Sequence, residues 1–183
     1  MLVNDAKEEV ENAWDWSALR GTLSATTVAD TFNYELNGAG HTMSILDVVN
    51  DSSNWFMDYR DAHTFNNWFL NSTPQKGEPR YYSFNGVSSD GDAQVEVYPI
   101  PDAAYNLRFN VVMRTADLVN DDDKLEVPSQ AVQMLAYAKA IEERGEDGGV
   151  GASSAYATAN RSLNDAISFD AARHPEELIW QEV

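Results

Sequence analysis

The side chains best suited to acid–base chemistry in this sequence are its three histidines, His41, His63 and His174. A catalytic histidine needs a nucleophile and an orienting carboxylate close by. None of the three lies beside a nucleophile motif such as Gly-x-Ser-x-Gly. The chain also lacks cysteine, which excludes thiol nucleophiles, thiolate metal sites and disulfides. We therefore predict no catalytic residue.

Two loops have compositions that could bind ligands. Gly145–Gly151 is rich in glycine, but it lacks the Gly-Lys-Ser/Thr ending of a phosphate-binding loop and contains two acidic residues. Asp117–Asp123 is rich in aspartate, but it lacks the spaced carboxylates, central glycine and closing glutamate of an EF-hand. We expect no cofactor and no metal site, and weak calcium binding by 117–123 remains open as an alternative.

The aromatic residues are the other candidates for binding, because an exposed aromatic anchor marks a site for a partner. The five tryptophans are Trp14, Trp16, Trp55, Trp68 and Trp180. The first four lie in periodic or corner patterns that favour a core position. A small β-rich carbohydrate-binding module that uses exposed aromatics stays open as an alternative function. A hydrolase with catalytic carboxylates among the 30 acidic residues is a third.

The overall charge restricts the class of partner. The chain has 12 basic and 30 acidic residues and a formal net charge of -18. Proteins bind nucleic acids largely through Lys and Arg that neutralise phosphates, so we expect this chain to repel DNA. Its 183 residues, 43% of them hydrophobic, are enough to bury the core of one domain.

Nothing in the sequence indicates a membrane segment. No apolar run approaches the roughly 20 residues that span a bilayer. The N-terminus, Met1–Glu9, is charged where a secretory signal would be apolar. We therefore expect no membrane contact and synthesis in the cytoplasm.

The middle of the chain alternates apolar and polar residues, which predicts strands. One helix, over Asp58–Leu70 and capped by Asp58 or Asp61, interrupts them. The predicted strands are a hairpin or two short strands within 21–36, then Met43–Val49, Arg80–Phe84, Gln94–Pro99 and Tyr105–Met113.

Helical spacing returns at both ends of the chain. The predicted helices are 2–14, with Glu8, Glu9 and Glu11 facing out, then 129–144 and 152–172. The buried face of the second is expected to contain Met134, Tyr137, Ala138 and Ile141. That of the third is expected to contain Ala155, Tyr156, Ala159, Leu163, Ala166 and Ile167.

This order of elements predicts an α+β fold. Its helical layer is formed by an N-terminal helix and two C-terminal helices, and a β-rich insertion from about 21 to 114 lies between them. The sequence has no linker long enough to separate independent domains. We expect a single domain over 1–173 followed by a C-terminal tail, 174–183.

Five motifs, in this order, make the chain resemble the head-to-tail adaptors of short-tailed phages, the tail tubular protein A-like family. Together they cover about residues 8 to 170. They are the corner Trp14–Arg20, the strand Thr31–Leu36, Gly77–Tyr82, Val97–Leu107 with its Tyr-Pro-x-Pro-Asp, and Asp117–Asp123 followed by Val127-Pro128.

The resemblance implies a non-enzymatic virion protein at the head–tail junction. Such adaptors form a homo-oligomeric ring, commonly a dodecamer, that joins the portal protein to the tail nozzle protein. DNA passes through the ring without specific binding, and an acidic lumen would let it slide.

The C-terminal segment is the expected contact with a partner. Pro175 prevents the preceding helix from continuing, so the segment must leave the body of the domain. Leu178, Ile179 and Trp180 are large apolar residues with no neighbouring element to cover them. Adaptors of the family use their C-terminal segments to bind the portal. We therefore predict that these three residues bind the portal protein, and the alternative is that the tail folds back onto its own subunit.

Overall fold

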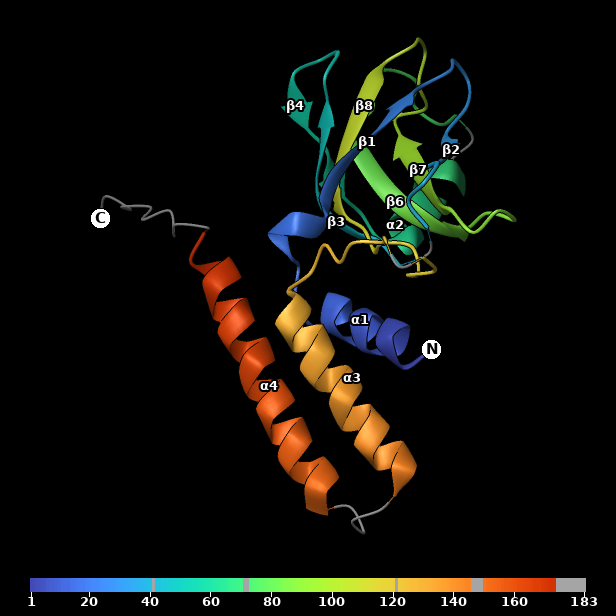
Figure 1. Ribbon diagram of the computed structural model, residues 1–183. Helices are drawn as coiled ribbons and strands as arrows, with labels where there is room; N and C mark the ends of the chain where they lie inside the picture. The colour runs from blue at the N-terminus through green and yellow to red at the C-terminus, as the bar shows by residue number, and fades with distance from the viewer. Residues whose placement is uncertain (41, 71–72, 121, 146–149, 174–183) are drawn as a thin grey trace. The chain divides into compact units, whose positions relative to one another are not determined.

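The structure is a computed structural model that describes residues 1–40, 42–70, 73–120, 122–145 and 150–173 (Figure 1). The chain divides into two compact units. Met1–Leu19 and Thr115–Val183 form one, which we call the helical unit, and Arg20–Arg114 form the other, the β unit.

The helical unit contains α1 (Leu2–Ala13), the short 3-10 turn η1 (Ser17–Leu19), α3 (Ser129–Arg144) and α4 (Val150–Ala171). α1 packs against α3, and α3 packs along α4. Figure 1 shows α3 and α4 as a long pair of neighbouring helices. The three helices predicted from helical spacing are confirmed, with ends that differ by no more than two residues.

The buried face of α3 differs from the prediction. Its buried residues are Ala131, Val132, Leu135 and Ala138, whereas Tyr137 is 62% exposed. Because α3 contacts both α1 and α4, small and branched side chains at i, i+4 and i+7 face its neighbours and allow close approach. The prediction gave too much weight to the large aromatic residue. The predicted stripe of α4 is confirmed, since its residues are buried or half-buried.

The N-terminal helix α1 buries two charged residues that its sequence pattern does not reveal. Glu11, predicted to face out, is buried together with Lys7. The two residues lie four apart, so they fall on the same face of the helix as Val10 and Ala6. The prediction for Glu11 is therefore wrong, because it assumed that a charged residue faces solvent.

The β unit consists of two four-stranded sheets and one short helix. Sheet A has the strand order β1-β8-β3-β4 and sheet B the order β2-β7-β6-β5. The elements are β1 (Arg20–Thr26), β2 (Asn33–Glu35), β3 (Ser44–Asn50), β4 (Trp55–Phe56), β5 (Asp58–Tyr59), α2 (Ala62–Leu70), β6 (Tyr81–Val87), β7 (Ala93–Tyr98) and β8 (Asn106–Val112).

The core of the β unit lies between the two sheets. Leu107, Phe109 and Val111 of β8 alternate inward and meet Val95 and Val97 of β7 in one buried cluster. The predicted α+β fold, with helices from both ends of the chain and a β-rich insertion, is thus confirmed.

The segment 21–36 forms two strands rather than a hairpin. β1 pairs with β8 in sheet A, and β2 pairs with β7 in sheet B. The chain leaves sheet A at Thr27, whose hydroxyl donates to the Ala103 carbonyl and accepts from the Tyr105 amide. Of the two alternatives, the pair of short strands is correct.

The helix α2 begins four residues later than predicted. The Asp61 carboxylate accepts hydrogen bonds from the amide and hydroxyl of Thr64, which places the cap at Asp61 rather than Asp58. Asp58 and Tyr59 instead form β5, parallel to β6. α2 packs against β6, and Trp68 stacks on Tyr98 with ring centroids 4.6 Å apart.

Candidate interaction site in the helical unit

The predicted portal contacts, Leu178, Ile179 and Trp180, lie outside the described residues. The last described residue, Arg173, lines a groove in the helical unit. The groove has a volume of about 600 Å³ and is a candidate site for a ligand or partner.

The groove lies between α4 and the segment that leads into α3. Residues of α4 line it, together with Trp16, Val127 and Pro128. The charged lining residues are Glu126, Arg161, Asp165, Asp170 and Arg173. A lining that combines apolar and charged residues is also found in contacts between proteins.

Phe169 is a large apolar side chain among the mostly polar residues by which α4 lines the groove. Its side chain is 76% exposed and lines the groove. A large apolar side chain beside a concave surface suits an anchor residue of a partner, because both lose apolar area to water on binding.

Asp170 fixes the corner Trp14–Ser17 against the end of α4. Its carboxylate is buried, with 7% of the residue exposed. It accepts hydrogen bonds from the Ser17 amide (2.9 Å), the Ser17 hydroxyl and the Trp14 indole (3.2 Å). The Arg173 guanidinium lies 3.8 Å from the same carboxylate. The geometry of this wall therefore depends on one buried acid.

The environment keeps Asp170 ionised. Burial raises the pKa of its carboxyl group, but the hydrogen bonds from Ser17 and Trp14 and the charge of Arg173 outweigh burial. The pKa of Asp170 therefore lies below its ordinary value.

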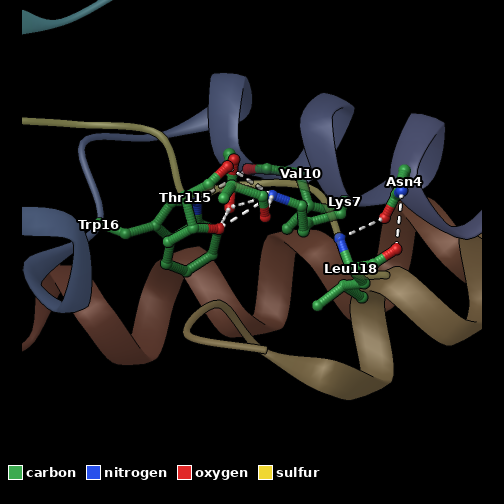
Figure 2. Close-up of polar contacts among 8 residues, drawn as sticks. Asn4, Lys7, Val10, Trp16, Thr115 and Leu118 are labelled. Carbon is green, nitrogen blue, oxygen red and sulfur yellow. Dashed lines mark hydrogen bonds and ion pairs between the residues drawn. The ribbon is translucent and has the colours of Figure 1, made fainter. Parts of the chain in front are cut away.

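A second buried charge joins α1 to the segment that enters α3 (Figure 2). The Lys7 ammonium donates to the Thr115 carbonyl at 2.8 Å and the Ala116 carbonyl at 3.0 Å, and lies 3.3 Å from Glu11. The Thr115 hydroxyl donates to Glu11 at 2.5 Å. Asn4 forms a reciprocal pair with the backbone of Leu118 at 3.0 and 3.2 Å. These contacts position the returning chain before it reaches Val127 and the groove.

The indole of Trp16 makes a further contact at this corner. Its N–H donates to the Val10 carbonyl at 2.7 Å, and the ring is buried. Trp16 thus joins α1 to the groove, as the core position predicted for it requires. Trp14 is 38% exposed, so the core position predicted for it is only partly correct.

The other two described tryptophans take part in packing of the β unit. Trp55 donates its indole N–H to the Pro79 carbonyl at 3.0 Å, and Arg80 lies over its ring. Trp68 stacks on Tyr98. These contacts explain both residues without a sugar ligand.

One carboxylate of the acidic loop 117–123 accepts hydrogen bonds from the backbone of the same loop. Asp123 accepts the Asn120 and Val119 amides, each at 2.7 Å, and these bonds lower the pKa of its carboxyl group. Within the described residues, no group of three or more His, Cys, Asp or Glu side chains could hold a metal ion. Calcium binding by 117–123 stays an untested alternative.

The described helices can also be compared with transmembrane helices in length and hydropathy. No helix in the described part of the chain is long and apolar enough to cross a bilayer.

Comparison with known families decides the class of protein. The model of the SU10 adaptor protein family matches residues 1–177. The chain belongs to this family. It is therefore a phage head-to-tail adaptor, a structural component of the virion, which confirms the prediction from the five motifs. We find no curated protein that matches the chain.

Membership of the family gives the interaction sites a context. A head-to-tail adaptor associates with the portal and tail proteins of the phage. The matched range contains the β unit, all described residues of the helical unit and the whole groove. Surfaces of either unit that are built to receive another protein are thus candidates for these contacts.

Sequence reasoning missed Asp170 and the groove. One signal could have revealed Asp170, because it continues the apolar stripe of α4 at helical spacing after Leu163 and Ile167. An acid in such a stripe must find donors when it is buried. The groove has no such signal, since its two walls come from distant parts of the sequence.

Proposed function

We propose that copies of this adaptor form a ring at the head–tail junction that joins the portal protein to the tail nozzle protein. The match to the SU10 adaptor protein family over residues 1–177 is the observation that carries this proposal. A dodecamer is the ring size that the resemblance favours, and the protein catalyses no reaction in this role. It is made in the host cytoplasm before it joins the virion.

The ring would surround the channel through which DNA leaves the head. The formal net charge of -18 per chain supports a surface that repels phosphates. DNA would then pass without specific contacts.

The chain is proposed to divide into an adaptor domain, 1–173, and a docking tail, 174–183. Both compact units would act within the adaptor domain. In the tail, Leu178, Ile179 and Trp180 would bind the portal protein. Burial of Trp180 as a hot spot would contribute about 2–4 kcal/mol to that binding.

Deletion of residues 175–183 tests the docking tail. The truncated protein keeps every described helix and strand, since α4 ends at Ala171, and should lose binding to purified portal rings; if it fails to fold, the tail packs on its own subunit instead. A full-length variant with Leu178→Ser, Ile179→Ser and Trp180→Ser is the matched control for chain length. It keeps all 183 residues and should also lose binding to portal rings. If the truncated protein folds and binds portal rings as tightly as the full chain, the tail is not the docking segment.

Electron microscopy of particles that carry the adaptor tests the ring. We expect a closed ring of identical subunits between portal and nozzle. Native mass spectrometry of the purified protein with portal rings gives the number of subunits. A single copy per particle would rule out the ring.

A further inference from the structure

The β unit has one long open sheet edge, at β1 (Arg20–Thr26). Within the described residues β1 pairs with β8 alone, so its other side has no strand partner. An open edge presents unpaired amide and carbonyl groups, which form a template for another strand.

The register identifies which groups of β1 face outward. The Thr27 amide donates to the Tyr105 carbonyl at 2.9 Å, so this pair is of the hydrogen-bonded kind. Such pairs alternate along an antiparallel ladder, which assigns Leu23 and Ala25 to bonds with β8. The amides and carbonyls of Thr22, Ser24 and Thr26 therefore face away from β8, toward the open edge.

The other sheet edges are short or distorted, as natural proteins require to avoid unwanted pairing. β2 has three residues, and β4 and β5 have two each. The part of β3 that β4 does not cover contains a bulge between Ile45 and Asp47. β1 has seven residues, no proline, no lysine and no bulge in its register with β8.

The side chains of β1 hold this edge in position. The hydroxyls of Thr22 and Thr26 donate to the side chains of Asn110 and Asn106 on β8, at 3.1 and 3.0 Å. On the other face, Leu23 and Ala25 pack against the core but stay only partly buried. A further strand would cover their remaining apolar area.

We propose that β1 binds an extended strand of a second protein of the head–tail junction, which continues sheet A by β-augmentation. The inference rests on the proposed function, because it gives the adaptor a second contact, separate from the tail. The incoming strand would have about seven residues with alternating character. Its apolar side chains would lie beside Leu23 and Ala25, and its polar ones beside Thr22, Ser24 and Thr26. Basic flanking residues would suit a chain with a net charge of -18.

A copy of the adaptor is a poorer source of this strand. Pairing of β1 with β1 of another copy is two-fold symmetric and gives a dimer rather than a ring. A ring needs β1 to meet a different surface of the next copy. The opposite edge of sheet A offers only the two residues of β4 and the bulged part of β3.

Amide hydrogen exchange of the full chain tests the proposal, alone and with purified portal protein or purified nozzle protein. In the free chain, the amides of Thr22, Ser24 and Thr26 should exchange fast and those of Leu23 and Ala25 slowly. In one of the two complexes, exchange of the outward amides should slow by about tenfold or more, while the inward amides barely change. This alternation is specific to strand pairing.

Ser24→Pro supplies an independent test. It removes an N–H that faces the open edge. Because that N–H makes no hydrogen bond to β8, sheet A should persist. Binding to the partner should weaken by about tenfold or more, because one hydrogen bond to the incoming strand is lost and the pyrrolidine ring of the proline obstructs that strand. Ser24→Ala removes the same hydroxyl, keeps the N–H, and should bind normally.

Three results would overturn the inference. If the complexes form but the outward amides still exchange fast, another surface makes the contact, and the adaptor function stands. If the outward amides are protected in a ring of adaptor alone, the strand comes from a second copy. If the full chain binds neither portal nor nozzle protein, the proposed function fails with it.

Discussion

Three buried charged residues, Asp170, Lys7 and Glu11, tie together segments of the helical unit that are distant in sequence. Asp170 binds the corner after α1, more than 150 residues earlier in the chain. Lys7 and Glu11 bind Thr115, which precedes α3. A buried charge is costly without partners, so each network stabilises only the arrangement that satisfies it.

Asp170→Ala should therefore destabilise the helical unit. It leaves the Ser17 amide and Trp14 indole without their acceptor, at a cost of about 2–3 kcal/mol at pH 7. Urea unfolding measures the loss. Asp165→Ala, an exposed acid on the same wall of the groove, is the matched control and should change stability little.

The same residue gives a pH dependence. The pKa of Asp170 is lower in the folded protein than in the unfolded chain. Its contribution is therefore present above the ordinary aspartate pKa of about 4 and is lost as the pH falls through the folded value. The stability difference between wild type and Asp170→Ala should narrow below about pH 4. A difference that stays constant down to pH 2 would show that the charge of Asp170 is unimportant.

Lys7→Met tests the second network. It leaves Glu11 buried without its cation, at a cost of about 3–5 kcal/mol. The double variant Lys7→Met, Glu11→Leu should be more stable than Lys7→Met alone, because no unpaired charge stays buried. Lys139→Met removes a partly exposed ion pair with Glu9 and should cost less than about 1 kcal/mol. If Lys7→Met and Lys139→Met lower the free energy of unfolding equally, burial of the Lys7–Glu11 pair does not matter for stability.

At the scale of elements, the positions of helices and strands follow from the sequence, whereas some of their partners do not. Alternation and helical spacing predict where α1, α3, α4 and β8 lie. They do not predict that β1 and β2 enter different sheets, because pairing depends on residues far along the chain, such as Ala103 and Tyr105 at Thr27. Nor do they reveal which face of α3 is buried, since two helices contact it.

The C-terminal end of α3 is set by one residue, Gly145. Gly145 has φ of 62°, and its amide donates to the Ile141 carbonyl at 3.2 Å. A left-handed residue there favours glycine. Gly145→Ala should cost about 1 kcal/mol, and Gly145→Asn should cost less, because asparagine tolerates this conformation. Thermal unfolding of both variants checks the order, and a more stable alanine variant would contradict it.

At the scale of the whole molecule, the strongest property is one that the sequence alone provides. The formal net charge of -18 is fixed by composition and needs no structure. The candidate groove and the open edge of β1, by contrast, depend on which residues the fold brings together. The charge thus predicts which ligand the adaptor repels, and the fold supplies the candidate surfaces for its partners.

The charge gives a prediction about DNA. A DNA-binding protein releases counterions from phosphates through its Lys and Arg residues, so its affinity rises steeply as salt is lowered. An adaptor with 30 acidic and 12 basic residues should instead be repelled more strongly at low salt, where screening is weakest. Fluorescence anisotropy with labelled duplex DNA should show no binding at physiological salt and none when the salt is reduced tenfold. A basic DNA-binding protein measured in the same assay serves as the positive control, since its affinity should rise as the salt is lowered. Micromolar binding by the unaltered chain at physiological salt would contradict a channel that DNA passes without contact.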